Sequence, residues 1–200
     1  GHGFCQHPQY MSFGIYDQNV DAHKGAFQTV SSADENFRHK GFKLENVYAP
    51  PISIGMLFHC YGKEHQQLMK KFRNFACIEV AVRDEPEGGQ LSVDNSGNLM
   101  ITKKLTSQDK RRRDAGLETV DHILHSSGAK EIIRSPYFFG LHLMGGCSMG
   151  TDEKKSVVNP EFQLHGHRNI YISDSSIFPS APVINPSLTI MALSQKLSGQ

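Results

Sequence analysis

Residues 75–83 limit the possible folds more than any other stretch of the chain. Apolar side chains take every second position there, and these are Ala76, Ile78, Val80 and Val82. Successive side chains of a β-strand point to opposite faces, so a period of two predicts a strand with one buried face. Such a strand is stable only in a sheet whose buried face is covered by other elements. We therefore expect a sheet protein with a packed core.

A β-hairpin is predicted directly afterwards, over residues 90–103. Alternating runs that contain Leu91 and Val93 on one side and Leu99 on the other flank the sequence Asp94-Asn95-Ser96-Gly97. These four residue types favour turns, because their short side chains bond to the local backbone or, for Gly, permit a positive φ. Two alternating runs joined in this way pair as antiparallel strands.

A helix is predicted from residue 106 to residue 127. Thr106 and Asp109 have the spacing of a capping box, and Gly128 is a typical residue just after a last helical turn. The apolar stripe at helical spacing consists of Leu117, Val120, Ile123 and Leu124. We expect this stripe to face the sheet and a short strand over 132–135 to follow.

The last third of the chain combines small-residue turns with two further elements. We predict a turn region over 140–150, a strand over 169–174 and a helix over 187–197. Asn185 is a typical N-cap, and Pro186 suits the first helical position, whose N–H needs no partner. The start of the last helix is therefore well marked.

The composition excludes partners that depend on a strong charge. The 200 residues contain 21 Lys and Arg against 20 Asp and Glu, which gives a formal charge of +1. So small a charge attracts neither nucleic acid nor an anionic membrane over long range. The apolar runs are also shorter than a bilayer span, and the basic run 110–113 is interpreted as an exposed helix face. We predict no nucleic-acid partner and no membrane span.

Metal ligands are not grouped in the sequence. The four cysteines are far apart, and His165 and His167 form an isolated pair. A zinc site needs three or four converging ligands, so we predict no metal. A cofactor-free polar site that uses these two histidines is an alternative.

The first residues carry neither an initiator Met nor a signal peptide. We expect the sequence to begin partway through a longer protein. Its localisation is not predicted beyond the cytoplasmic default.

Three short segments of the last third form the strongest functional pattern. They are His142-Leu143-Met144-Gly145-Gly146-Cys147, Asp174-Ser175-Ser176 and Asn185-Pro186-Ser187-Leu188-Thr189-Ile190. Oxidation of an alcohol requires a base for the hydroxyl proton while a hydride leaves the carbon atom. A histidine suits that task, because its unperturbed pKa is about 6.5. The helix that begins near Pro186 adds a partly positive end, which stabilises negative charge.

Together these segments resemble the C-terminal signature of the glucose-methanol-choline (GMC) family of FAD-dependent alcohol oxidoreductases, most closely its cholesterol oxidase and long-chain alcohol oxidase branches. The predicted elements indicate an α+β fold with a mainly antiparallel sheet flanked by helices, expected on one side, and the resemblance identifies it as the family's substrate domain. It assigns residues 1–140 to a substrate-binding domain and residues 141–200 to the active-site segment. That segment would supply the last strand and helix of an FAD-binding domain. The Gly-rich FAD-binding part of the family is absent from this chain.

The resemblance also implies the chemistry. It predicts hydride transfer from an alcohol CH–OH group to N5 of FAD, with His142 as the base and Asn185 as the anchor of the substrate hydroxyl. The positions that border the flavin are Asp174, Ser175, Pro186 and Ser187. The expected partners are a small-molecule alcohol and the missing N-terminal FAD-binding part.

Two points remain open from the sequence. The chain could be a flavin-free, non-catalytic fragment that acts only as a binding or structural module, because it lacks the Gly-rich loop that holds a pyrophosphate. The side chain of Asn185 also has two competing roles, since it cannot cap its own helix and anchor a substrate at once.

Overall fold

The computed structural model describes residues 1–32 and 34–199. These residues form two compact units, each built from separate stretches of the chain. The first unit contains Gly1–His7, Arg83–Lys110 and Gly140–Gln200, and the second contains Pro8–Val82 and Arg111–Phe139. The predicted division into domains 1–140 and 141–200 concerns function and stays a prediction.

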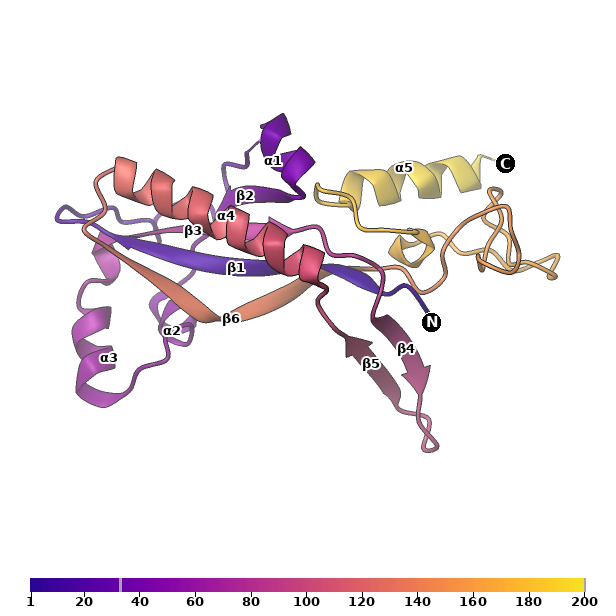
Figure 1. Cartoon of the computed structure of the whole chain (residues 1–200), viewed down its shortest axis with the longest axis horizontal. Helices are drawn as coiled ribbons and strands as arrows, with labels where there is room; N and C mark the ends of the chain where they lie inside the picture. The colour runs from indigo at the N-terminus through magenta and orange to yellow at the C-terminus, as the bar shows by residue number, and fades with distance from the viewer. Residues whose placement is uncertain (33, 200) are drawn as a thin grey trace. The chain divides into compact units, whose positions relative to one another are not determined.

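A four-stranded sheet organises the fold, with the strand order β2-β3-β1-β6 (Figure 1). Its strands are β1 (Cys5–Ile15), β2 (Phe42–Asn46), β3 (Phe75–Val82) and β6 (Glu131–Met144). The central strand β3 pairs antiparallel with both β1 and β2. The prediction of a strand in residues 75–83 and of an antiparallel sheet is confirmed.

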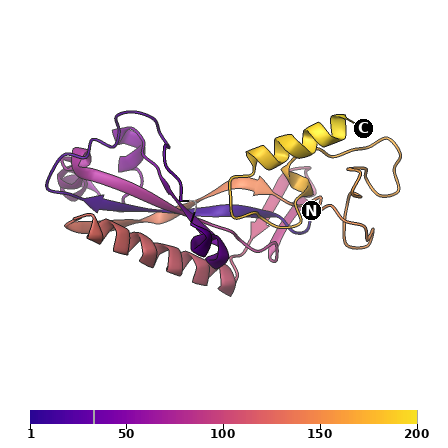
Figure 2. The same ribbon diagram turned by 90° about the horizontal axis from the view of Figure 1, so that it is seen from above.

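One face of this sheet packs against the long helix α4 (Ser107–Ser126), which lies along one side of the sheet in Figure 2. Phe42 and Val80 from the sheet form a buried cluster with Val120 and Leu124 from the helix. The latter two belong to the predicted apolar stripe, whereas Ile123 of the same stripe is 39% exposed. Burial of such side chains contributes about 1.5–3 kcal/mol each to folding.

The opposite face of the sheet is covered as well. Phe13 and Phe75 pack there against Ile54 of α2 (Pro51–Gly55) and against the residues that follow it. The helix α3 (Gly62–Met69) adds Leu68 and Met69 to this cluster, and the short helix η1 (Phe72–Asn74) adds Phe72. The expectation that helices lie on one side was wrong. The helices on this face, α2 and α3, are only 5 and 8 residues long and leave a weak signal in the sequence.

The start of α4 is held as its sequence predicts. The backbone N–H of Thr106 donates to Asp109 Oδ2 at 2.7 Å, and the N–H of Asp109 donates to Thr106 Oγ1 at 3.2 Å. Beyond its end Gly128 has φ +96 and donates to the carbonyl of His125. The capping box and the glycine stop are both confirmed.

The basic run at the start of α4 departs from its prediction. Arg112 is 7% exposed and lies against Gly41, the αL residue that ends α1 (Glu35–Lys40). The expectation of an exposed basic face was wrong for this residue, because the aliphatic part of an Arg side chain can pack like an apolar one. Among the described residues, no helix is both long and apolar enough to cross a bilayer.

The strand β1 was not predicted, although it is 11 residues long. It contains Pro8, and its polar residues His7, Gln9 and Ser12 are 1%, 2% and 0% exposed. A strand buried on both faces lacks the alternation of apolar and polar residues that identifies a half-buried strand. Its sequence therefore shows no period of two.

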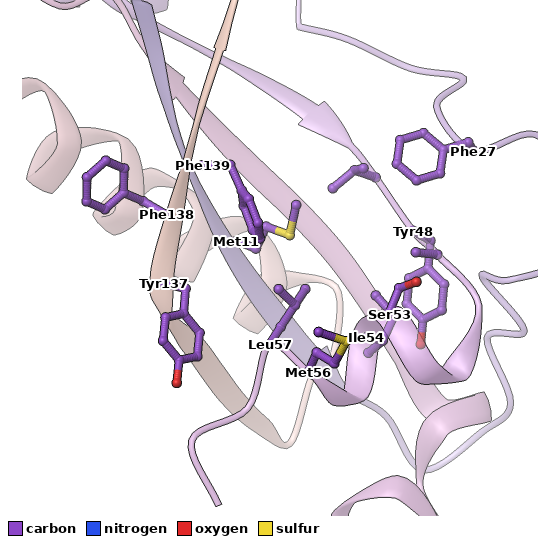
Figure 3. A pocket seen from close by; sticks show the side chains of 12 residues that line it. Met11, Phe27, Tyr48, Ser53, Ile54, Met56, Leu57, Tyr137, Phe138 and Phe139 are labelled. Atoms are coloured by element: carbon purple, nitrogen blue, oxygen red, sulfur yellow. The ribbon is translucent and has the colours of Figure 1, made fainter. Parts of the chain in front are cut away.

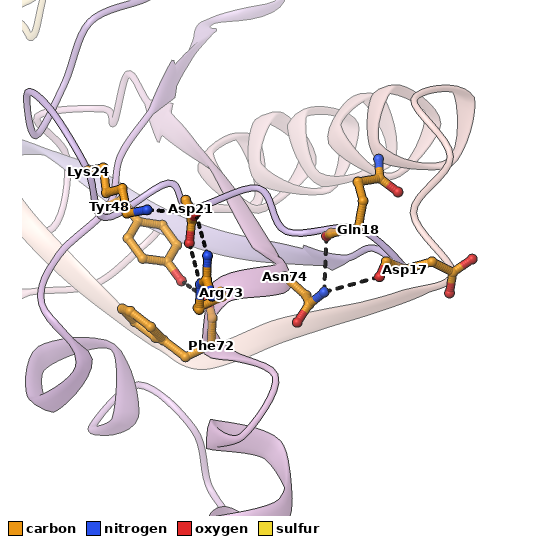
Figure 4. Close-up of polar contacts among 8 residues, drawn as sticks. All are labelled: Asp17, Gln18, Asp21, Lys24, Tyr48, Phe72, Arg73 and Asn74. Carbon is orange, nitrogen blue, oxygen red and sulfur yellow. Dashed lines mark hydrogen bonds and ion pairs between the residues drawn. The ribbon is translucent and has the colours of Figure 1, made fainter.

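A network of polar contacts anchors the loop after β1 to the start of β3 (Figure 4). Arg73 Nε and Nη2 donate to the two carboxylate oxygens of Asp21 at 2.7 and 2.9 Å. Asn74 Nδ2 donates to the backbone carbonyls of Asp17 and Gln18, and Tyr48 OH donates to the carbonyl of Phe72. The hydrogen bonds from Arg73 hold the pKa of the Asp21 carboxyl well below its usual range.

The first unit contains the predicted hairpin, formed by β4 (Gly89–Val93) and β5 (Leu99–Lys103). In its turn Asp94 Oδ1 accepts from the backbone N–H groups of Ser96 and Asn98, each at 2.8 Å. A buried cluster that includes Cys5, Phe162 and Ile177 forms the core of this unit.

Two predictions for the last third were wrong. Residues 169–174 form only an isolated bridge between Gln163 and Tyr171, before the short helix η2 (Ser175–Ile177). The predicted strand 132–135 continues to Met144 as β6, so the turn region begins at Gly145 and not at residue 140. The helix α5 (Ser187–Ser198) is confirmed.

Candidate functional site

Backbone hydrogen bonds join two of the three predicted site segments in the first unit. The N–H groups of Gly145, Cys147 and Met149 donate to the carbonyls of Ser175, Ser176 and Ile177 at 3.0, 2.9 and 2.9 Å. The hydroxyl of Ser175 donates to the carbonyl of Leu143 at 2.7 Å. The turn after His142 therefore runs alongside η2, although more than 25 residues separate the two segments in the sequence.

The glycines of this turn are required by its geometry. Gly145 and Gly146 have φ +77 and +96, a region that residues with a Cβ rarely occupy. A Cβ added to Gly145 would lie 2.1 Å from the carbonyl oxygen of Gly3. Both glycines have a positive φ, and the close approach to Gly3 was not visible in the sequence.

His142 lies near the end of β6 with φ +52. A non-glycine residue with a positive φ in a strand is held there by its surroundings, and such strain is common at functional sites. The ring of His142 contacts that of His7 edge to face, with ring centroids 5.0 Å apart. The two Nδ1 atoms are 2.9 Å apart, which is hydrogen-bond distance.

The partners of His7 determine which nitrogen of His142 carries a proton. His7 Nε2 lies 2.6 Å from the carbonyl oxygen of Pro182, which can only accept, so this nitrogen is protonated. In a neutral His7 ring Nδ1 is then the acceptor, and His142 Nδ1–H is the donor. The lone pair of a neutral His142 is consequently on Nε2, the position from which it can accept a proton.

His7 is a residue that the sequence reasoning missed. It is 1% exposed and lies 135 positions before His142. The only signal in the sequence is a histidine followed by Pro8 near the start of the chain. Neither its burial nor its partner follows from that pair.

The predicted cap of α5 is wrong by one residue. The N-cap is Pro186, whose φ of −83 and ψ of −10 are already helical, and the helix begins at Ser187. Asn185 precedes the cap and is exposed, three residues after Pro182, which contacts His7. The N-cap position is therefore not that of Asn185, whose role as a hydroxyl anchor stays a prediction.

The four predicted flavin-bordering residues have distinct surroundings. Asp174 accepts from the N–H of Ser176 at 2.8 Å and so caps η2, while the Ser175 hydroxyl is bonded to the backbone. At α5 the N-cap Pro186 supplies no side-chain hydrogen bond. The first N–H groups of a helix carry a partial positive charge. This end of α5 fits a group that gains negative charge, as a reduced flavin does.

The alternative histidine pair is part of a loop. His165 Nε2 lies 3.0 Å from Ser156 Oγ and 3.2 Å from the carbonyl of Gly150, and His167 Nδ1 lies 3.2 Å from the carbonyl of His165. These contacts hold the loop over 150–167 together. Within the described part of the chain, no group of three or more His, Cys, Asp or Glu residues is placed to hold a metal ion.

Comparison with known proteins adds the family context. The family model described as GMC oxidoreductase matches residues 92–194. An uncharacterized GMC-type oxidoreductase of Mycobacterium tuberculosis is 25% identical, over 100% of this chain and 35% of that protein. A long-chain-alcohol oxidase of Arabidopsis thaliana is 24% identical, over 96% of this chain and 32% of that protein. The chain thus spans about a third of the length of these relatives.

Solved structures share the fold. Pyridoxine 4-oxidase from Mesorbium loti matches with a TM-score of 0.75 and 14% identity, over 100% of this chain and 43% of that chain. A formate oxidase of Aspergillus oryzae studied for its FAD modification matches with a TM-score of 0.70 and 12% identity, over 100% of this chain and 46% of that chain. At such identities the match concerns the fold alone.

Proposed function

This chain belongs to the GMC oxidoreductase family, and we propose that it serves the oxidation of the CH–OH group of an alcohol, with His142 as the base. The family in general catalyses flavin-dependent oxidation of alcohols. The family context favours this reading over a non-catalytic module.

One observation carries the proposal, namely the hydrogen-bonded series from His142 through His7 to the carbonyl of Pro182. It leaves the lone pair of His142 on Nε2, so this atom can take the hydroxyl proton of a substrate. When it does, His142 gains a positive charge, and the bond from its Nδ1–H to His7 strengthens because charged donors bond more tightly. The positive φ of His142, which is uncommon for a residue with a Cβ, further supports the proposal.

Asn185 is proposed to hold the substrate hydroxyl. Its side-chain amide offers both a donor and an acceptor, so it can bond the hydroxyl oxygen before and after the proton leaves. An alcohol positioned in this way presents its hydroxyl to a base and its C–H bond to a hydride acceptor. Such orientation lowers the entropic cost of reaching the transition state.

The cofactor proposed for this site is FAD, which when bound supplies the acceptor for the substrate hydride. The residues that would hold it are Asp174, Ser175, Pro186 and Ser187. The backbone N–H groups at the start of α5 would stabilise negative charge on it. The binding site for its pyrophosphate is proposed to come from a part of the protein outside this chain.

The test is His142→Gln in the full-length protein. Glutamine keeps a hydrogen-bonding side chain but has no basic nitrogen, so flavin reduction by alcohol should slow about 10²- to 10⁴-fold. The rate is measured by stopped-flow absorbance, and the visible spectrum confirms that FAD is retained. The matched control is His167→Gln, an exposed residue, which should reduce flavin at the unmodified rate. Full activity of His142→Gln with bound FAD would contradict the proposal.

A further inference from the structure

The second unit contains a pocket of about 590 Å³ on the face of the sheet opposite α4 (Figure 3). Pockets of about 300–1,000 Å³ are typical of small-molecule sites. Its walls come from β1, from the segment 47–57 and from the aromatic residues 137–139 of β6. Figure 3 shows the side chains of Met11, Leu57 and Phe139 around the same space.

The walls are almost entirely hydrocarbon, sulfur and aromatic ring. None of the described residues that line the pocket is Asp, Glu, Lys, Arg or His. Of the two tyrosines, Tyr48 donates its hydroxyl to the carbonyl of Phe72 at 3.0 Å, and the hydroxyl of Tyr137 lies 3.2 Å from His59 Nδ1. The pocket therefore offers few polar groups to a ligand.

The back and the mouth of the pocket differ in exposure. At the back Val47, Tyr48 and Ile54 are at most 4% exposed, and the contacts in Figure 4 fix the position of Tyr48. At the mouth Phe27 and Met56 are 58% and 73% exposed. Large apolar side chains gathered around a hollow mark a binding surface, because leaving them in water is unfavourable.

We infer that this pocket binds a hydrophobic alcohol, aliphatic or ring-fused, and that such alcohols are the substrate class of the protein. The word substrate rests on the function proposed above, whereas the binding of an apolar ligand does not. A sugar would lose hydrogen bonds to water that these walls do not replace, at a cost for each hydroxyl. A quaternary ammonium could contact the aromatic rings but would find no carboxylate among the lining residues.

The first test measures binding without catalysis. The pocket contains Met11 and Met56, so ¹³C-methyl methionine spectra of the full-length protein report on it directly, with signals assigned by Met→Leu variants. We expect 1-decanol to shift both signals, and D-glucose and choline to shift neither. Met100, on β5 of the first unit, is the internal reference. A shift with choline alone, or no shift with 1-decanol, would overturn the inference.

A matched pair of variants tests the position of the ligand. Met56 and Ile52 are 73% and 81% exposed on the same helical segment, but only Met56 lines the pocket. Met56→Glu should weaken 1-decanol binding at least about tenfold, because a charge beside the hydrocarbon must be desolvated. Ile52→Glu should leave it unchanged. Equal effects of the two substitutions would refute the assignment.

The results separate this inference from the proposed function. If no alcohol is oxidised but 1-decanol still shifts both methionine signals, the proposed function fails and the apolar site stands. If a sugar or choline is oxidised while both signals stay in place, the function stands and the substrate class fails.

Discussion

The two units of the chain depend on different interactions, hydrogen bonds in the first and apolar packing in the second. In the first unit directional hydrogen bonds position single atoms, as between His142 and His7 or between Gly145 and Ser175. In the second unit aromatic rings such as those of Phe13 and Phe58 pack edge to face in an apolar core, with centroids 5.0 Å apart. Proton transfer depends on the distance and the angle between donor and acceptor atoms, whereas contact with a hydrocarbon depends on shape and area. The first unit is therefore suited to placing a proton, and the second to holding an apolar group.

The second unit is not wholly apolar, because it also contains a buried cluster of charged and polar side chains. On the sheet face that carries the pocket, Glu79 pairs across strands with Glu45, and Lys43 Nζ lies 2.6 Å from Glu45. Gln28 Nε2 lies 3.3 Å from Glu45 and 3.5 Å from Glu79. Burial, and then the charge of Glu45, raise the pKa of Glu79 to about 8. At neutral pH Glu79 is therefore protonated.

The largest predicted effect comes from this cluster. Because the folded pKa of Glu79 lies above the usual value, the folded state binds the extra proton, and stability is lost as pH rises through about 8. Between pH 6 and pH 9 the free energy of unfolding should fall by on the order of 2–3 kcal/mol. Glu79→Gln copies the protonated acid and should remove most of this fall. Urea unfolding at the two pH values measures it, and the same fall in the variant would refute the explanation.

The second prediction sharpens the description of the first unit. Gly145 and Gly166 have similar φ angles of +77 and +75, but only Gly145 lies close to another backbone group, Gly3. Alanine at either position pays about 1–2 kcal/mol for the left-handed conformation. Gly145→Ala should cost about 2 kcal/mol more, because its Cβ would collide with a carbonyl oxygen. Thermal unfolding of the two variants gives the difference, and equal costs would show that the turn can move.

The third prediction concerns His7 as a positioning residue. His7→Leu removes the acceptor for His142 Nδ1–H, so flavin reduction should slow about 10- to 100-fold. His7→Gln can still accept from His142 and donate to Pro182, so it should recover part of the rate. A purely packing role predicts the opposite order, because Leu is the better apolar filler. The pH profile of the rate checks the assignment, since loss of the His7 contact should displace the limb that reports on His142.

The elements that the sequence predicted are those whose signals are local. The helix α4 is marked by Thr106, Asp109 and Gly128, all within a turn of its ends, and the β4–β5 hairpin by the Asp94–Gly97 turn. The strand β1 escaped prediction because both of its faces are buried. The predicted strand at 169–174 failed because this segment forms a single bridge, at Tyr171, and Ile170 and Tyr171 are 47% and 50% exposed.

The sequence by itself determined the family, the strands and helices with local signals, and the three segments around His142, Asp174 and Asn185. Only the tertiary structure decided that His7 meets His142 across 135 residues, and thereby which nitrogen of His142 holds the lone pair. It also decided that Met11, Ile54 and Phe139 line one pocket. Caps and periodicity depend on neighbours in the sequence, whereas these contacts depend on how the whole chain closes on itself. Contacts between residues far apart in the sequence form only when the whole chain packs, so no local pattern predicts them.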